Sequence, residues 1–264
     1  MDLQLQGRTA LVTASTGGIG RAIACALARE GATVHVNGRT EEGVAAALRH
    51  IADRVPGAAL RPLVADGSTA DGVAAMLEAL PAVDLLVNNL GIYDDKPFLE
   101  ADDAAWFRSF EANVMSGVRL ARHYLPRMLH RGSGRIVFVS SESALQIPVE
   151  MIHYGMTKTA QLAVARGLAE TLTGTNVTVN SVLPGPTASE GVGGFIADLA
   201  ASKHVSVASM EREFFATARP TSILQRFATP EEVAAMIVYV CSARASATTG
   251  AALRVDGGVV RAIV

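Results

Sequence analysis

The fold is decided by residues 8–38, which read RTALVTASTGGIGRAIACALAREGATVHVNG. A β-branched run at Arg8–Thr13 leads into a glycine-rich turn at Thr13–Gly20, a helical stretch at Gly18–Glu30 and a second run at Thr33–Asn37. This order is typical of a βαβ unit. The glycines allow the backbone to turn sharply and approach a pyrophosphate, whose charge then faces the amides of a helix N-terminus. We therefore expect a dinucleotide site here, with a purely structural glycine turn as the alternative.

The alternation of short apolar runs and longer helical stretches continues almost to the end of the chain. It predicts a Rossmann-type α/β fold, a doubly wound parallel sheet of about seven strands flanked by helices on both faces. The remaining strands are expected at Leu60–Ala65, Val83–Asn88, Arg135–Ser140, Val177–Val182 and Ala251–Val255, and the remaining helices at Glu41–Arg54, Ala70–Leu80, Asp102–Arg131, His153–Thr173 and Pro230–Cys241. No linker or repeat interrupts the pattern, so we expect one domain over residues 1–264.

One segment, from Ser189 to about Phe227, breaks this alternation. It is rich in glycine at first and then amphipathic, with apolar residues such as Ile196, Met210 and Phe215. Its length suggests an insertion that lines the substrate site. Two helices that pack their apolar faces on the body would give the same pattern, and both interpretations can hold.

The composition narrows the classes of partner. The 264 residues carry a formal charge of −2 with no basic block, which disfavours nucleic acid or an anionic membrane as the main partner. No apolar run nears the roughly 18 residues that a membrane helix needs. Cys25 and Cys241 lie far apart in apolar helical stretches, so we expect two buried free thiols in a reducing, cytoplasmic compartment. The histidines and carboxylates show no metal-ligand spacing, so no metal is expected.

The end of the second strand bears on the choice of cofactor. An acidic residue there would accept hydrogen bonds from the ribose 2′-hydroxyl of NAD(H), but this chain has Gly38 and then Arg39. The Arg39 guanidinium can bind a 2′-phosphate, which favours NADP(H) over NAD(H), unless Arg39 is only a solvated surface charge. Asp66, just past the third strand, could accept a hydrogen bond from the adenine amino group or serve as an ordinary turn residue.

Tyr154 and Lys158 are four residues apart in a helical stretch, so their side chains share one face. A tyrosine with its ordinary pKa of about 10 is a poor base at neutral pH, but a nearby ammonium stabilises the phenolate and makes the tyrosine a usable proton carrier. The pair follows a strand that ends in Ser140-Ser141, at the edge where open α/β sheets bind ligands. A hydroxyl there can donate a hydrogen bond to a substrate carbonyl oxygen. The alternative is that Tyr154 packs on the core face of its helix.

With these motifs in this order, the chain resembles the short-chain dehydrogenase/reductase family over essentially its full length. The resemblance rests on Thr13–Gly20, Asp66, Asn88–Gly91, Asn113, Ser141, Tyr154, Lys158, Pro184-Gly185 and Val255–Gly258. It implies hydride transfer between NADP(H) and a small carbonyl/alcohol pair, with Tyr154 as acid/base, Lys158 as its partner and Ser141 as hydrogen-bond donor to the substrate. It also implies that Asn113 holds a water in a proton relay, and that the chain forms a homotetramer through the two long helices and the C-terminal strand.

For the cofactor, the resemblance and the glycine turn indicate residues along one edge of the sheet. They are Thr13, Ser15, Thr16, Gly18, Ile19, Gly20, Arg39, Asp66, Asn89, Gly91, Tyr154, Lys158, Pro184, Gly185, Thr187 and Ser189. Ala14 replaces the first glycine of the family and suits the turn if its φ is negative. Leu90 replaces an alanine of the family and must find space beside the cofactor. His153 and Glu142, next to the expected catalytic residues, are left outside the expected site.

Three other functions remain open at this point. The first is an NAD(H)-preferring dehydrogenase of the same family. The second is a catalytically weak dinucleotide-binding sensor, although such proteins usually lose the tyrosine or the lysine. The third is sugar-nucleotide epimerase or dehydratase chemistry, which normally needs a larger C-terminal region than the roughly 80 residues after Pro184. Neither the substrate nor the physiological direction is indicated.

Overall fold

The computed structural model describes residues 1–263, without the side chain of Phe195. Its centre is a seven-stranded sheet in the order β3-β2-β1-β4-β5-β6-β7, with every neighbouring pair parallel. The strands are β1 (Thr9–Val12), β2 (Thr33–Gly38), β3 (Leu60–Val64), β4 (Leu85–Asn88), β5 (Gly134–Val139), β6 (Val177–Pro184) and β7 (Ala252–Val255). The expected Rossmann-type fold is confirmed, and the strand ends differ from the expected ones by at most two residues.

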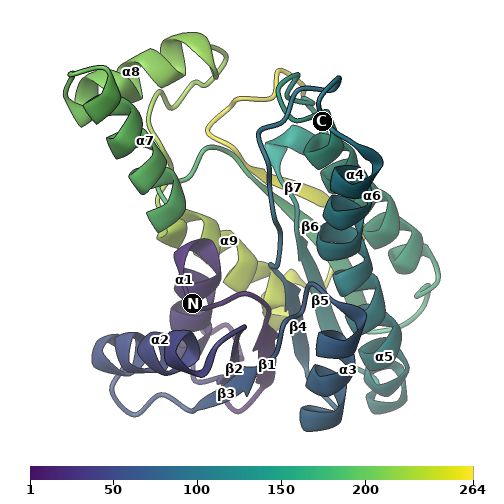
Figure 1. Cartoon of the computed structure of the whole chain (residues 1–264). Helices are drawn as coiled ribbons and strands as arrows, with labels where there is room; N and C mark the ends of the chain where they lie inside the picture. The colour runs from purple at the N-terminus through teal and green to yellow at the C-terminus, as the bar shows by residue number, and fades with distance from the viewer. Residues whose placement is uncertain (264) are drawn as a thin grey trace.

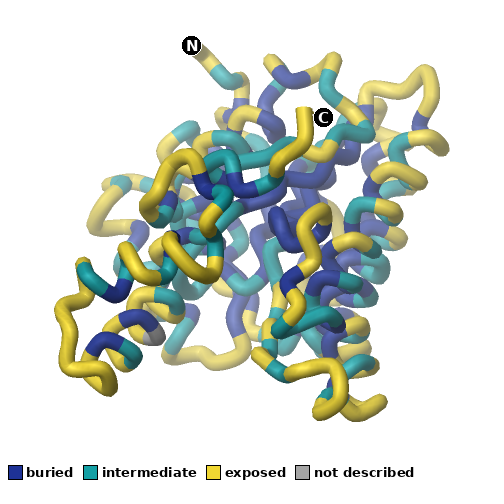
Figure 2. The backbone as a smooth tube through the Cα atoms, turned by 90° about the horizontal axis from the view of Figure 1, so that it is seen from above, coloured by how far each residue is buried: buried dark blue, intermediate teal, exposed yellow. Residues whose placement is uncertain are grey.

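Helices cover both faces of this sheet (Figure 1). One face is covered by α1 (Gly18–Arg29), α2 (Glu41–Arg54) and α9 (Pro230–Cys241), and the other by α3 (Ala70–Ala79), α5 (Ser116–Arg131) and α6 (Ile152–Glu170). Each face has its own apolar core, the first around Ile23 and Ile237 and the second around Tyr124, Met128 and Ile136. The central strands are therefore buried on both sides, which explains their continuous apolar runs. Figure 2 shows the buried segments in the middle and the exposed turns around them.

The expectation of one helix over Asp102–Arg131 is wrong in the middle of that stretch. The structure has α4 (Asp103–Phe110), a π-helical turn η1 (Glu111–Met115) and then α5. A π turn adds a residue to one turn of the helix and often marks a functional site. Here it rotates Asn113 inward, where its side chain is buried.

The segment after β6 forms two further helices, α7 (Glu190–Ser202) and α8 (Val207–Thr217), which project from the body of the fold (Figure 1). Their apolar residues, including Ile196, Ala200 and Met210, pack mainly on one another. A bridge between Thr187 and Ala228 closes the base of this excursion. The two expected amphipathic helices are present, but their apolar faces pack on each other rather than on the body, and a role in lining the substrate site stays a prediction.

Two other expectations concern the fold. Cys25 and Cys241 are both free and buried. Among the helices that the structure describes, none combines the length and the apolar character needed to cross a bilayer.

Candidate active site

The glycine turn between β1 and α1 is tied to the end of β4. The Thr13 hydroxyl accepts hydrogen bonds from the backbone N–H groups of Asn89 and Leu90, both at 2.9 Å. Asn89 Nδ2 donates to the carbonyl oxygens of Thr13 and Ala14 at 3.0 and 3.2 Å. The carboxyl ends of two neighbouring parallel strands are thereby held together at the expected cofactor edge.

The Ser15 side chain also works inside the turn. Its hydroxyl donates to the Val12 carbonyl oxygen at 2.8 Å and accepts from the Asn37 backbone N–H at 2.9 Å, and the residue is fully buried. Thr13 is buried in the same way. Both expected cofactor residues would therefore act by shaping the turn rather than by presenting a hydroxyl to a ligand.

Ala14 adopts a φ of +50°, in the left-handed region. The condition of a negative φ is not met, and the conformation costs a residue other than glycine about 1–2 kcal/mol. The turn is narrow here, since a Cβ atom added at Gly20 would lie 2.4 Å from the Ala14 carbonyl oxygen. This strain is located where the backbone would approach a pyrophosphate, as is common at functional sites.

The N-terminus of α1 attracts an anion. The helix has no side-chain cap and no acidic residue in its first turn, so its first N–H groups are not satisfied by its own residues. Instead, Glu190 at the start of α7 accepts a hydrogen bond from the Gly18 backbone N–H at 3.0 Å and forms an ion pair with Arg21. The carboxylate stands where the helix dipole favours a phosphate, so the turn fits the diphosphate of a dinucleotide.

The residues expected to choose the cofactor lie at the end of β2. Arg39 is exposed and forms no ion pair with any residue that the structure describes. Asp66 accepts hydrogen bonds from the backbone and side chain of Ser68 at 3.0 and 2.7 Å, and these bonds, with a smaller effect from Arg39, lower its pKa. Asp66 is therefore a turn residue in this structure, and its contact with the adenine amino group stays a prediction.

Gly38 allows close packing at this point. A Cβ atom added to it would lie 2.4 Å from Thr16 Cγ2 and 3.0 Å from Val44 Cγ2. Exchanging Gly38 for aspartate would therefore disturb the turn as well as add charge. The choice of cofactor is better tested at Arg39.

Tyr154 and Ser141 meet at the carboxyl end of β5. β5 ends at Val139, and Ser141 follows two residues later and is buried. Tyr154 lies in the first turn of α6. Burial raises the pKa of the Tyr154 hydroxyl, and its hydrogen bond with Ser141 opposes this shift. The pKa of Tyr154 is therefore raised, whereas the sequence predicted that Lys158 would lower it. With a raised pKa, the phenol keeps its proton at neutral pH.

Lys158 reaches the same place from one turn further along α6. Its Nζ atom lies 5.6 Å from the centre of the Tyr154 ring and donates to the Val139 carbonyl oxygen at 3.1 Å. Gln161 Oε1, at 3.4 Å, is its other acceptor. Burial lowers the pKa of Lys158 to about 8, because no carboxylate compensates the ammonium. Gly91 lies close beside it, since an added Cβ would lie 3.1 Å from Nζ.

Asn113 is held firmly by its neighbours. Its Nδ2 atom donates to the Ile92 carbonyl oxygen and to Thr157 Oγ1, both at 2.9 Å, and its Oδ1 atom accepts from the Ile92 N–H at 2.7 Å. Gln161 Nε2 donates to the Asn113 carbonyl oxygen at 2.6 Å. The side chain is thus occupied in joining the 92 loop to α6, and Gln161 bridges Asn113 and Lys158. The spacing of Gln161 from Lys158, on one helix face, is the signal that could have indicated it.

The segment after β6 closes the other side of the edge. Gly185 passes the Asp256 backbone so closely that an added Cβ would lie 2.7 Å away. The Thr187 hydroxyl donates to the Gly185 carbonyl oxygen at 2.9 Å, and Ser189 Oγ caps α7 by accepting from Val192 N–H at 3.4 Å. Ser189 packs against Gly18, whose added Cβ would lie 3.2 Å from Ser189 Cβ. These residues therefore lie beside the glycine turn.

An ionic cluster next to Ser141, centred on the buried Glu142, was not expected from the sequence. Ser141 Oγ donates to Glu142 at 2.6 Å, and Glu142 forms an ion pair with Arg219 Nε at 3.2 Å. Arg219 Nη1 lies 3.5 Å from Glu150. Glu142 and Arg219 are 77 positions apart, and no local pattern links them.

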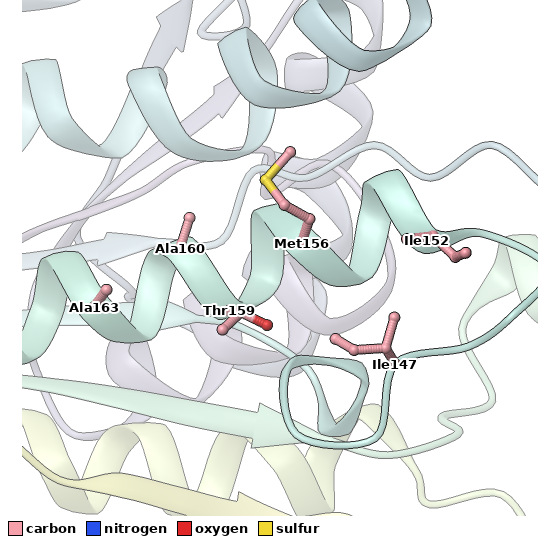
Figure 3. A pocket seen from close by; sticks show the side chains of 6 residues that line it. All are labelled: Ile147, Ile152, Met156, Thr159, Ala160 and Ala163. Carbon is pink, nitrogen blue, oxygen red and sulfur yellow. The ribbon is translucent and has the colours of Figure 1, made fainter. Parts of the chain in front are cut away.

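His153 lies outside this group. It is buried, and its ring faces Trp106 of α4 at a centroid distance of 6.0 Å. An apolar hollow of about 450 Å³ lies along α6, and none of the expected site residues lines it (Figure 3). Its lining consists of Ile147, Ile152, Met156, Thr159, Ala160 and Ala163. Leaving His153 outside the expected site agrees with this geometry, whereas Glu142 contacts a residue of that site.

Comparison with known proteins identifies the family to which this chain belongs. A family model described as "Enoyl-(Acyl carrier protein) reductase" matches residues 13–260. The "Uncharacterized oxidoreductase YvaG" of Bacillus subtilis (strain 168) is 48% identical over 263 residues, with 100% of both chains covered. The chain belongs to the short-chain dehydrogenase/reductase family. As a short-chain dehydrogenase/reductase, it is an NAD(P)-dependent oxidoreductase with a small-molecule substrate.

Two further relatives of this dehydrogenase/reductase have names that indicate different substrates. The 3-oxoacyl-[acyl-carrier-protein] reductase FabG of Aquifex aeolicus (strain VF5) is 33% identical over 264 residues, covering 98% of this chain and 100% of its own. L-Sorbose reductase from Gluconobacter frateurii, solved with NADPH and L-sorbose, has a TM-score of 0.93 and 31% identity, with 100% of both chains covered. The family is therefore established, and the substrate has to be inferred from the site.

Proposed function

We propose that this short-chain dehydrogenase/reductase uses NADP(H) to reduce a ketone or aldehyde, or to oxidise the matching secondary alcohol. The observation that carries the proposal is the meeting of Ser141, Tyr154 and Lys158 beside the glycine turn. An assay of NADPH oxidation with a panel of small carbonyl compounds tests it. If no member of the panel is reduced, even in a single turnover, the alternative of a dinucleotide-binding sensor gains support.

The roles of the catalytic residues follow from their surroundings. When bound, NADPH supplies the hydride. Tyr154 holds a proton at neutral pH because burial raises its pKa, and it would donate that proton to the substrate oxygen. Ser141 would turn its hydroxyl from Glu142 toward the same oxygen and stabilise the charge that develops there. Lys158 contributes a positive charge beside the Tyr154 ring, and Asn113 fixes the helix and loop that flank them.

The dinucleotide would be held by residues along the carboxyl edge of the sheet. The turn of Thr16, Gly18, Ile19 and Gly20 would face its diphosphate, and Pro184–Ser189 would close over it from the opposite side. Asp66, Asn89 and Gly91 would complete the edge between these two segments.

NADP(H) is the proposed cofactor because the position after Gly38 carries an exposed guanidinium, without an ion pair among the described residues, and no carboxylate. Arg39→Ala should weaken NADPH binding by about tenfold or more and leave NADH binding nearly unchanged, because a charge-assisted bond to the 2′-phosphate is lost. Fluorescence titration of both cofactors against both proteins measures this. Arg61→Ala, an exposed arginine on β3, is the control for a general loss of positive charge. An equal loss for both cofactors would mean that Arg39 does not bind the phosphate.

We further propose that the chain is one cytoplasmic domain with a substrate-lining insertion at 189–227, and that it forms homotetramers through its long helices and C-terminal strand. The apolar hollow along α6 (Figure 3) supports self-association, since the long helix of a second copy could cover it. Sedimentation velocity should give a tetramer. A monomer at all concentrations would contradict this part of the proposal.

A further inference from the structure

We infer that the substrate of the proposed reductase is a neutral, polyhydroxylated carbonyl compound of the sugar type, selected by Glu150 and Arg219. This inference rests on the proposed function and adds the chemical class of the substrate. The relatives named above include one acyl-carrier-protein reductase and one sugar reductase, so the family alone leaves the class open.

The cluster of Glu142, Arg219 and Glu150 lies at the reacting residues. Glu142 accepts the 2.6 Å hydrogen bond from Ser141 Oγ. Both Glu142 and Arg219 are close enough to act on the pKa of Tyr154, Glu142 raising it and Arg219 lowering it. A substrate whose carbonyl oxygen meets Ser141 and Tyr154 would bring its neighbouring carbon atoms close to this cluster.

The charge of the cluster selects against anions. Two carboxylates face one guanidinium, so the group carries one net negative charge. The side chains of Glu142 and Arg219 are only 7% and 15% exposed, so water screens their charges weakly, whereas Glu150 is 39% exposed and is screened more strongly. A carboxylate or phosphate group placed beside Glu142 and Glu150 would be repelled by them, whereas a neutral hydroxyl group would not.

The free hydrogen-bonding capacity of the cluster matches hydroxyl groups. Arg219 uses Nε for Glu142 and Nη1 for Glu150 and the Ala218 carbonyl oxygen, and Nη2 has no acceptor among the residues that the structure describes. Glu150 is 39% exposed and can accept further hydrogen bonds. A sugar hydroxyl both donates and accepts, so adjacent hydroxyls can bind this donor and these acceptors together.

The site is also rigid and has an aromatic wall. The segment after Arg219 is fixed to the C-terminal loop, since Thr221 Oγ1 donates to the Val259 carbonyl oxygen at 2.6 Å and Ile223 N–H donates to Gly257 at 2.8 Å. Tyr93, which is 62% exposed, packs edge-on against Tyr154 with a centroid distance of 6.3 Å. Its ring offers an apolar surface for the C–H groups of a sugar.

The test compares three carbonyl compounds with NADPH: L-sorbose, which is neutral and hydroxylated, 5-keto-D-gluconate, which carries a carboxylate, and 2-hexanone, which has no hydroxyl group. We expect kcat/KM for L-sorbose to exceed each of the others by at least about tenfold. In Glu150→Gln, the ratio of kcat/KM for L-sorbose to that for 5-keto-D-gluconate should fall by about tenfold, because one negative charge is removed without a change of shape. Glu213→Gln, which removes a carboxylate paired with Lys203 between α7 and α8, is the matched control and should keep the wild-type ratio.

A second measurement separates recognition from a merely structural role. Ligand-observed NMR should detect binding of D-sorbitol and not of D-gluconate to the wild type, and Glu150→Gln should reduce that difference. If Glu150→Gln lowers Tm but changes neither the kcat/KM ratio nor the difference in binding seen by NMR, the cluster only anchors the loop and the inference is wrong. Reduction of 2-hexanone or 5-keto-D-gluconate in preference to L-sorbose would overturn the inference while the proposed function stands. If none of the three compounds is reduced while another member of the carbonyl panel is, the inference is wrong and the proposed function stands.

Discussion

Tyr154→Phe is expected to lower turnover by at least about 10²-fold and to leave the fold and NADPH affinity intact. The substitution removes a single oxygen atom, and the ring keeps its contacts with Tyr93 and Lys158. The loss arises because Tyr154 is the group that would donate the proton to the substrate oxygen, and phenylalanine has no hydroxyl. Steady-state NADPH oxidation with a reducible carbonyl measures the turnover, and circular dichroism with a cofactor titration measures the rest.

The control for this experiment is Tyr239→Phe, which removes an exposed hydroxyl from α9 and should not affect the rate. A correctly folded Tyr154→Phe protein with full turnover would show that Tyr154 only packs on the core face of its helix. The proposed mechanism would then be wrong.

Lys158→Met should abolish most of the activity and at the same time raise Tm at pH 7. General acid/base chemistry that loses its charged partner is expected to slow by about 10²–10⁴-fold. By resemblance to the family, Lys158 also holds the nicotinamide ribose, so NADPH binding should weaken, which distinguishes this variant from Tyr154→Phe. The rise in Tm follows because methionine fills the same buried space without the cost of burying an ammonium.

The pH dependence of that stabilisation has a definite sign. Burial lowers the pKa of Lys158 from 10.5 in the unfolded chain to about 8 in the folded chain, so protonation favours the unfolded state. The penalty is fully present below pH 8 and disappears as the pH rises toward 10.5. The difference in Tm between Lys158→Met and wild type should therefore be largest at pH 7 and shrink at higher pH. Lys203→Met, at an exposed lysine, is the control. A difference in Tm that does not vary with pH would contradict this origin.

The sequence was sufficient for the fold because its alternating pattern is a direct consequence of burial. Strands such as β4 and β6 are buried along their whole length, and only a parallel sheet covered on both faces produces such runs. The glycine turn at Thr13–Gly20 marked the start of α1 correctly, since this signal depends on adjacent residues. The π turn at Glu111–Met115 could not be predicted, because one inserted residue changes the hydrogen bonding and leaves the apolar periodicity almost intact.

The candidate site was predictable only where its residues are local in sequence. Tyr154, Lys158 and Ser141 follow from one strand and one helix, and the structure brings them together. Arg219 and Glu190 could not be found, since their partners lie 77 and 172 positions away. The raised pKa of Tyr154 was also missed, because burial of a hydroxyl depends on the whole fold rather than on the neighbouring lysine.

The carboxylate of Glu190 at the start of α1 has a consequence for the catalytic cycle. An incoming diphosphate and this side chain compete for the same Gly18 N–H and the same helix end. Because Glu190 belongs to the same chain, it would compete at a fixed effective concentration. It would lower the apparent affinity for every dinucleotide equally. The same competition assists departure, since the helix end regains an anionic partner as soon as the spent nucleotide leaves. Glu190 would thus exchange tight binding for rapid release, and its exposed side chain would have to leave the helix end each time the cofactor binds.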